Sequence, residues 1–277
     1  MAEAELWAGD MGREWSRRAE ALDRQLAPAG EAGMRVLAPQ PGERILDLGC
    51  GSGATTETLS KAVAPGGQIT GADISADQIA VARARPGNAG ADFIVGDAQT
   101  HPFEDAAFDA LFSRFGCMFF GDPVAAFSNL RRALKPGARA VLLAWRALAM
   151  NPWAAVPAGV GAEILGPVDP PPPGTPGPFA WAEPEIFAPI FEGAGFQGTI
   201  WSEAPITLQI GDGEDPDPVA RALNMLMRIG PLARRLKEQP QDIRDRVREA
   251  LAPRLAPFVS EDWVRMPGVI WIIESRA

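Results

Sequence analysis

The sequence predicts an α/β fold built on a doubly wound, mostly parallel sheet. Three observations predict it. Short apolar segments alternate with helical segments between residues 44 and 145, a glycine-rich turn follows the first apolar segment, and the chain closes on another strongly apolar run at 269–273. Because strands that alternate with helices are joined by right-handed crossovers, helices should cover both faces of the sheet.

The expected elements follow the chain from the first strand onward. Ile45-Leu46-Asp47-Leu48 is a short apolar run that stops at Gly49, and a helical stretch begins at Ala54. Ala138 to Trp145 is apolar enough to be a strand buried on both faces. Further strands are expected at 68–73, 91–96 and 108–113, with helices at 76–84 and 123–134.

Outside this core the composition of the chain changes. Residues 1–38 predict an N-terminal helical segment, and the core itself spans 39–147. Prolines crowd the segment 148–184, where Pro170 to Pro173 are consecutive, so we expect an extended lid rather than a helix of the core. The remainder divides into a returning helix and strand at 185–211, a helical insertion at 212–266 and a final strand at 267–277.

The charge and cysteine content exclude several classes of function. Asp and Glu outnumber Lys and Arg by 35 to 26, a formal net charge of −9, so no nucleic-acid partner is expected. Two cysteines, Cys50 and Cys117, predict neither a disulfide framework nor a metal site.

No apolar stretch approaches the roughly 20 residues that span a bilayer, and residues 1–10 lack the pattern of a secretory signal. We therefore expect a cytoplasmic protein that acts on a small molecule without a membrane partner, in an oligomeric state that composition does not determine.

The glycine turn after the first strand is the strongest functional signal. Glycines at 49, 51 and 53 let the backbone bend tightly and let a ligand lie against bare main chain. Asp73 ends the second strand 20 residues after the last glycine, where an acid commonly binds both ribose hydroxyls. The spacing is G-x-G-x-G rather than the G-x-G-x-x-G of dinucleotide enzymes, and the Gly-Lys-Ser/Thr of a P-loop does not occur. With Asp47 at its mouth, the turn suits a ligand with a positive ammonium group better than a diphosphate.

On these motifs, residues 40–146 and the closing strand resemble the class I S-adenosylmethionine-dependent methyltransferases. The resemblance implies a Rossmann-like, seven-stranded sheet whose last strand is antiparallel. It also implies that the glycine loop surrounds the methionine part of the cofactor, that Asp73 binds the ribose, and that Asp97 meets the adenine amino group. The cofactor-binding residues that it implies are Asp47, Gly49, Cys50, Gly51, Gly53, Asp73, Ile74, Asp97, Ala98, Arg114, Phe115 and Trp15.

More narrowly, three segments look like the bacterial small-molecule branch of this family, which is similar to the methyltransferases of ubiquinone and menaquinone biosynthesis. They are Asp97–Phe103, Phe112–Gly116 and Leu134–Gly137. In this branch an N-terminal segment often folds over the cofactor, which is the basis for including Trp15. A hydrophobic staple onto the edge of the sheet is an equal alternative for that residue.

Several of these residues also have a purely structural interpretation. Asp73 could cap the helix that follows it, although ribose binding is favoured. Asp97 could form a turn, and Asp47 is expected to order the glycine loop rather than to touch the ligand. His101, the only histidine, falls in a predicted surface loop and is not taken as a general base, while Cys117 is expected in the core. No catalytic residue and no metal ligand is therefore predicted.

The predicted function is methyl transfer from S-adenosylmethionine to a small, hydrophobic acceptor, with S-adenosylhomocysteine as the product. Transfer from a sulfonium is an in-line displacement, which needs orientation and exclusion of water more than a base. Ligands bind at the carboxyl ends of the strands, so the segments 148–184 and 212–266 are expected to close over the acceptor. The alternatives are a nicotinamide-dependent oxidoreductase and an S-adenosylmethionine-binding protein without methyl-transfer activity.

Overall fold

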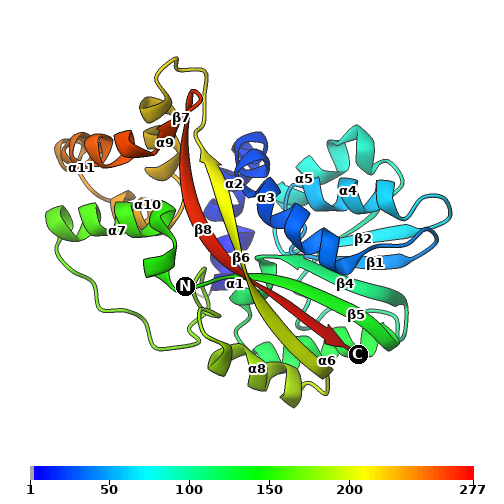
Figure 1. Cartoon of the computed structure of the whole chain (residues 1–277). Coiled ribbons are helices and arrows are strands. Elements are labelled where there is room, and N and C mark those ends of the chain that lie inside the picture. Colours follow the sequence, from blue (N-terminus) through cyan, green and yellow to red (C-terminus); the bar gives the residue numbers. More distant parts are fainter. Residues whose placement is uncertain (1–2) are drawn as a thin grey trace.

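The computed structural model describes residues 3–277. It has one mixed sheet with helices on both faces and a further group of helices beside one end of the sheet (Figure 1). In chain order the strands are β1 (Arg44–Leu48), β2 (Gln68–Asp73), β3 (Asp92–Val95), β4 (Phe108–Arg114), β5 (Leu134–Trp145), β6 (Gln197–Ile210), β7 (Val259–Ser260) and β8 (Trp263–Arg276).

The sheet confirms the predicted Rossmann-like arrangement with an antiparallel last strand. Its strand order is β3-β2-β1-β4-β5-β8-β6, and the short β7 pairs with β8. Strands β1 to β5 run parallel to one another, whereas β8 is antiparallel to both β5 and β6. Because β1 lies between β2 and β4, the carboxyl ends of these three strands meet at one edge of the sheet.

Helices cover the two faces of the sheet, and short 3-10 turns stand at several of the connections between a helix and a strand. The N-terminal part of the chain reaches the sheet through a close contact at Gly33, where a Cβ would lie 2.9 Å from Leu143 and 3.0 Å from Phe112. No residue other than glycine fits there without a shift of these side chains. The covering helices are α3 (Ala19–Leu37), α4 (Ala54–Ala62), α5 (Ala76–Ala84), α6 (Pro123–Ala133) and α8 (Pro184–Gly193). The 3-10 turns are η1 (Pro86–Asn88), η2 (Gly116–Phe119), η3 (Leu148–Met150) and η4 (Ala256–Phe258).

Two further helices precede α3, namely α1 (Glu3–Ala8) and α2 (Asp10–Arg17). α2 packs against α5, so the start of the chain lies near the edge where the parallel strands end. Within residues 3–277, no helix combines the length and the apolar character needed to cross a bilayer.

The proline-rich segment contains a helix that the sequence analysis did not predict, α7 (Pro152–Leu165). Pro152 stands in the first turn, where its missing N–H interrupts no hydrogen bond. Trp153 is buried, so the packing of one helix face outweighs the low helix propensity of Pro157. The expectation of an extended lid throughout 148–184 was therefore wrong for its first half, and irregular structure is confined to the residues between α7 and α8.

A cap of four helices lies beside the sheet (Figure 1) and consists of α7, α9 (Pro218–Leu226), α10 (Pro231–Leu236) and α11 (Gln241–Leu255). A long two-stranded ribbon connects it to the sheet, because β6 and β8 stay paired as far as Ile210 opposite Val264. The final strand accordingly begins at Trp263 rather than at the expected residue 267. The first residues of β8 pair with β6 outside the core sheet. The sequence did not predict this start, because the apolar pattern of one strand does not reveal where its partner strand lies.

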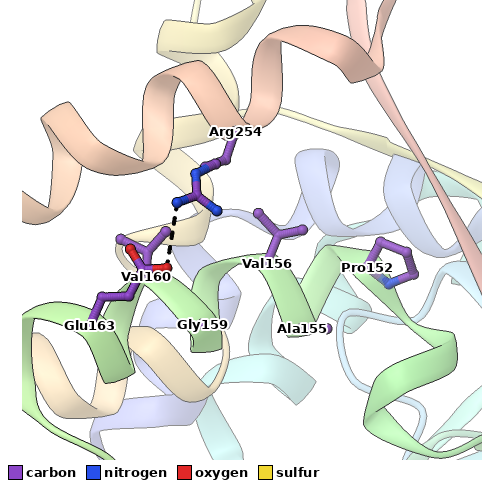
Figure 2. Close-up of a pocket in the computed structure, with 7 residues that line it drawn as sticks. All are labelled: Pro152, Ala155, Val156, Gly159, Val160, Glu163 and Arg254. Carbon is purple, nitrogen blue, oxygen red and sulfur yellow. Dashed lines mark hydrogen bonds and ion pairs between the residues drawn. The ribbon is translucent and has the colours of Figure 1, made fainter.

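A cavity of about 320 Å³ opens between α7 and α11 of the cap (Figure 2). An ion pair between Glu163 and Arg254, 3.4 Å apart, lies across it. Gly159 borders the same space, and a Cβ at this position would meet nothing within 4 Å. The other lining residues are Pro152, Ala155, Val156 and Val160. None of the residues expected to bind the cofactor lines this cavity.

Gly159→Ala should raise the free energy of unfolding by about 0.5–1 kcal/mol, because alanine loses less backbone entropy in a helix and its methyl group enters open space. Urea unfolding followed by circular dichroism measures the change. Gly161→Ala in the same helix is the matched control. Its Cβ would lie 3.0 Å from Leu232, so this variant should gain less stability than Gly159→Ala or lose stability. Equal losses in the two variants would contradict the open space beside α7.

Candidate cofactor site

The turn between β1 and α4 is built from three glycines in the left-handed region. Gly49, Gly51 and Gly53 have φ angles of +65°, +54° and +80°, which side chains with a Cβ rarely adopt. A Cβ on Gly49 would also lie 2.7 Å from the Cα of Gly116, which begins η2 after β4. The turns that follow β1 and β4 are therefore in direct backbone contact, and the main chain at this edge is bare.

Asp73 joins the end of β2 to this glycine turn. One carboxylate oxygen accepts the backbone N–H of Gly51 at 2.9 Å, and the other accepts the N–H of Ser75 at 2.8 Å. Burial raises the pKa of Asp73, and its hydrogen bonds to backbone N–H groups oppose that shift. The cap of α5 is Ser75 and not Asp73, because the hydroxyl of Ser75 accepts the N–H of Gln78. The capping alternative for Asp73 was therefore wrong, and its carboxylate remains at the mouth of the turn.

Asp47 lies beneath the turn rather than at its surface. Its Oδ2 accepts the hydroxyl protons of Thr55 at 2.7 Å and Thr56 at 2.6 Å, which stand in the first turn of α4. Its Oδ1 is buried without a hydrogen-bond partner. Burial raises the pKa of Asp47, with the two threonine hydroxyls acting in the opposite direction. These contacts connect β1 to α4 across the glycine turn. They are consistent with the expectation that Asp47 orders the turn rather than touches the ligand.

The loop after β3 lies next to Asp73. The backbone N–H of Gly96 donates to the Asp73 carbonyl at 3.0 Å, which brings Asp97 and Ala98 to the same edge. The Asp97 carboxylate accepts the N–H of Gln99 at 2.9 Å, so a turn-forming contact is present. Ala98 is buried and Asp97 is half-buried. Ile74 is also half-buried, between Asp73 and the start of α5. Adenine binding at this loop stays a prediction.

The end of β4 carries the most unusual backbone conformation of the site. Phe115 has a φ of +68°, which is rare for a bulky residue and marks backbone strain. Its ring is stacked on Trp145 at the end of β5, with centroids 4.2 Å apart and planes 4° from parallel. Packing of the ring thus stabilises a turn that places the neighbouring Gly116 against Gly49.

Arg114, the last residue of β4, is a buried cation with a long ion pair. Its side chain is 12% exposed, and its guanidinium lies 3.8 Å from Oδ1 of Asp23. Burial lowers the pKa of Arg114, while Asp23 and Asp47 favour its charged form. A guanidinium in this state can bind an anionic group that enters the site.

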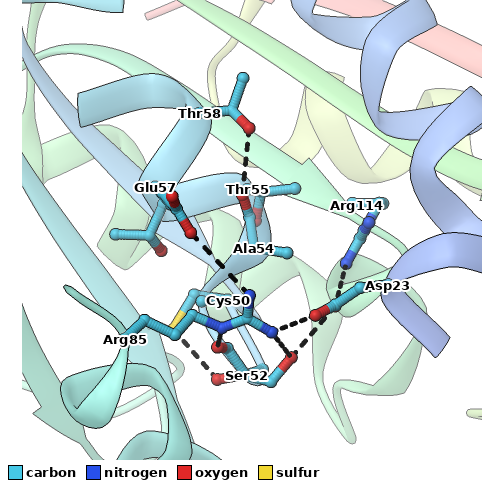
Figure 3. A network of polar contacts seen from close by, with 12 residues as sticks. Asp23, Cys50, Ser52, Ala54, Thr55, Glu57, Thr58, Arg85 and Arg114 are labelled. Carbon is cyan, nitrogen blue, oxygen red and sulfur yellow. Dashed lines mark hydrogen bonds and ion pairs between the residues drawn. The ribbon is translucent and has the colours of Figure 1, made fainter. Parts of the chain in front are cut away.

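A polar network that the sequence analysis missed holds α3 across the glycine turn (Figure 3). Oδ1 of Asp23 accepts the Ser52 hydroxyl at 3.1 Å, and the other oxygen of Asp23 pairs with Arg85. Arg85 also donates to the Ser52 carbonyl and lies 3.9 Å from Glu57. No sequence spacing links these residues. The one signal in the sequence was Asp23 itself, an acidic residue on the apolar side of a predicted helix.

Trp15 belongs to a cluster of rings contributed by the N-terminal helices. Its ring lies edge-on to Trp7, with centroids 5.1 Å apart, and Trp7 lies edge-on to Phe119 of η2 at the same distance. Gly12 of α2 contacts Ser75, where a Cβ would come within 2.2 Å of the hydroxyl. The segment expected to cover the cofactor therefore lies at the edge formed by β2 and β4.

Neither cysteine is suited to nucleophilic chemistry. Burial raises the pKa of the Cys50 thiol well above its ordinary value and also raises that of Cys117. The sulfur of Cys50 lies next to Gly71 of β2 and 3.9 Å from the Gly51 carbonyl oxygen. His101 packs edge-on against Phe103 in the loop after β3. Among the described residues, no cluster of three or more His, Cys, Asp or Glu side chains could hold a metal ion.

Comparison with known proteins identifies the domain that carries this site. Residues 46–142 match the family model described as a methyltransferase domain. This segment is similar to class I S-adenosylmethionine-dependent methyltransferases, with distant similarity to demethylmenaquinone methyltransferases. It is 36% identical over 111 residues to the demethylmenaquinone methyltransferase of Staphylococcus aureus, a match that covers 40% of this chain and 46% of that protein. The chain spans less than half the length of such curated relatives.

Two solved structures share the fold over nearly the whole chain. Phosphoethanolamine N-methyltransferase 2 of Haemonchus contortus, in complex with S-adenosyl-L-methionine, is 17% identical with a TM-score of 0.56, covering 99% of this chain and 60% of that one. The [4+2]-cyclase SpnF is 19% identical with a TM-score of 0.55, covering 100% of this chain and 97% of that one. At these identities the similarity concerns the fold alone.

Asp47→Asn should change how stability depends on pH. Because burial raises the pKa of Asp47, the folded protein binds a proton there more readily than the unfolded chain, whose aspartates titrate near pH 4. The contribution of Asp47 to stability therefore falls as the pH rises from about 4 through the raised pKa. The total fall is about 1.4 kcal/mol for each unit by which the pKa in the folded protein exceeds that in the unfolded chain. The variant lacks this loss, so its free energy of unfolding should rise relative to the wild type over that range.

Urea unfolding at a series of pH values between about 4 and 8 measures this difference. Asp77→Asn, an exposed residue on α5, is the control and should follow the wild type. An Asp47→Asn advantage that shrinks with rising pH would contradict the burial of a carboxylate at this position.

Proposed function

We propose that the chain is an S-adenosylmethionine-dependent methyltransferase that transfers a methyl group to a small, hydrophobic acceptor. The observation that carries the proposal is the bare glycine turn at the end of β1, whose central N–H is held by the acid that ends β2. The match of residues 46–142 to the methyltransferase domain supports the same assignment.

The residues at this edge fit the cofactor group by group. The main chain at Gly49, Gly51 and Gly53 would lie against the methionine part. The Asp73 carboxylate, which has lone pairs beyond its two backbone contacts, would accept the ribose hydroxyls. The loop at Asp97 would meet the adenine. Arg114, whose only ion pair within the described residues is the long one to Asp23, would bind the methionine carboxylate.

The chemistry asks little of individual side chains. The cofactor supplies a methyl group on a sulfonium, a good leaving group, so the protein has to align the acceptor and exclude water, effects worth up to roughly 7–11 kcal/mol. The buried carboxylates of Asp47 and Asp73 favour a positive charge beside the turn. No thiol or histidine is assigned to proton transfer.

A row of aromatic rings runs from the end of β4 toward the cap, on the side where we place the acceptor. From Phe115 the rings continue to Trp145 at 4.2 Å, then to Trp153 of α7 at 4.8 Å and to Phe179 at 6.2 Å. This row leads from the end of β4 into the cap and the irregular segment before α8. It supports an apolar acceptor covered by the segments 148–184 and 212–266, and the similarity to demethylmenaquinone methyltransferases points the same way.

A second candidate is binding of S-adenosylmethionine without methyl transfer. The [4+2]-cyclase SpnF, which is named for an activity other than methyl transfer, shares the fold over the whole chain, and no base is assigned in the site of this protein. Labelled S-adenosylmethionine incubated with a panel of apolar phenols, quinols and hydroxylated polyketides distinguishes the two. Transfer of label to any of these acceptors excludes the second candidate, whereas cofactor binding with no transfer across the panel supports it.

Calorimetric titration should show that the protein binds S-adenosylhomocysteine and not NAD. Asp73→Ala should weaken that binding by about 1–3 kcal/mol, because hydrogen bonds to a charged acceptor are lost. Asp77→Ala, an exposed acid four residues away, should bind as the wild type does. Tight binding of NAD without S-adenosylhomocysteine would overturn the proposed function in favour of an oxidoreductase, and an unchanged Asp73→Ala affinity would remove that residue from the site.

Arg114→Leu should weaken S-adenosylhomocysteine about 10- to 100-fold while leaving 5′-methylthioadenosine, which lacks the amino-acid part, little changed. The same titration measures both ligands. Arg35→Leu on the exposed side of α3 is the matched control. Equal losses for the two ligands would mean that Arg114 supports the fold of the site and does not bind the carboxylate.

A further inference from the structure

The N-terminal helices bridge the two strands that flank β1. On one side Gly12 of α2 is packed against Ser75, directly after β2, so closely that a Cβ would lie 2.2 Å from the Ser75 hydroxyl and 2.3 Å from the Trp7 carbonyl oxygen. On the other side the ring of Trp7 meets the ring of Phe119, after β4, at 5.1 Å. Since β1 lies between β2 and β4, Gly12 and Trp7 together bridge the edge where the glycine turn lies.

The indole N–H of Trp7 is shielded from solvent and has no hydrogen-bond acceptor. Buried donors are nearly always paired in folded proteins, and a donor without an acceptor carries a desolvation penalty. The neighbouring Trp15 has no buried polar atom without a partner. The two rings are in contact, and of the two only Trp7 has a buried indole N–H without an acceptor.

Further contacts hold the helices in this position from the far side. Lys237, directly after α10, pairs with Asp10 at 2.6 Å, and Arg234 of α10 lies 3.8 Å from the sulfur of Met11. The start of the chain is thus anchored to the cap as well as to the edge of the sheet. The ring of Trp7 contacts Phe119 of η2, and its carbonyl oxygen lies beside Gly12, the residue that contacts Ser75.

We infer that the indole N–H of Trp7 donates a hydrogen bond to the bound sulfonium nucleoside, so that α1 closes over the cofactor through Trp7 and not through Trp15. This inference rests on the proposed function, because the ligand that supplies the acceptor is S-adenosylmethionine or its product. Trp7 is then a binding residue that the glycine and acid motifs do not reveal.

Trp7→Phe keeps an aromatic ring and removes only the N–H and part of the ring volume. Calorimetric titration with S-adenosylhomocysteine should show an affinity about 3- to 10-fold weaker than that of the wild type. Trp201→Phe, at an exposed tryptophan of β6, is the matched control and should change the affinity less than twofold. Because the unpaired donor is gone, ligand-free Trp7→Phe should unfold at a temperature no lower than the wild type, while the rise in melting temperature on adding S-adenosylhomocysteine should be smaller.

A second measurement reports on the N–H itself. In a ¹⁵N-labelled protein, the indole resonance missing from the Trp7→Phe spectrum identifies Trp7, and saturating S-adenosylhomocysteine should move that proton downfield. Unchanged affinity in Trp7→Phe together with an unmoved resonance would overturn the inference while leaving the proposed function standing. Equal losses in Trp7→Phe and Trp201→Phe would mean that the loss does not come from the Trp7 N–H and would also overturn it. Failure of the wild type to bind S-adenosylhomocysteine would remove the proposed function and the inference together.

Discussion

The contact between Gly49 and Gly116 is the constraint on which the site depends. The turn after β1 and the turn after β4 touch through their backbones, and a Cβ on either glycine would come within 2.8 Å of the other's Cα. This contact leaves the edge of the sheet without side chains at the point where β1 ends. The left-handed conformation of Phe115 follows from it, because the chain has to leave β4 sharply to bring Gly116 into place.

Each of the three acids around this edge has a different kind of partner. Asp47 accepts threonine hydroxyls, Asp73 accepts backbone N–H groups, and Asp23 pairs with arginine. Asp23 is the one of these three that forms ion pairs, whereas Asp73 has backbone N–H groups and Asp47 has two hydroxyls and the more distant Arg114 to oppose the effect of burial. Burial of such groups favours a positively charged ligand beside them, which is the physical reason that a sulfonium suits the site better than a diphosphate does.

The accessory elements are organised around the same edge. The ribbon of β6 and β8 extends out of the sheet and carries α9, α10 and α11, while α7 leaves β5 at Trp145. The N-terminal helices contact both the cap and the end of β2. Segments from the beginning, the middle and the end of the chain therefore meet above the carboxyl ends of the strands, where an acceptor and a cofactor would have to be enclosed together.

The sequence by itself determined the alternation of strands and helices, the glycine turn, and the positions of Asp73 and Asp97 at strand ends, because these depend on local periodicity and on residues close in the chain. Tertiary structure decided what depends on distant partners. Pro152 to Leu165 became a helix because Trp153 found a buried face, β8 began at Trp263 because β6 was there to pair with it, and Asp23 met Ser52 and Arg85 only through folding. No spacing within the chain encodes such contacts, since each partner contributes half of the interaction.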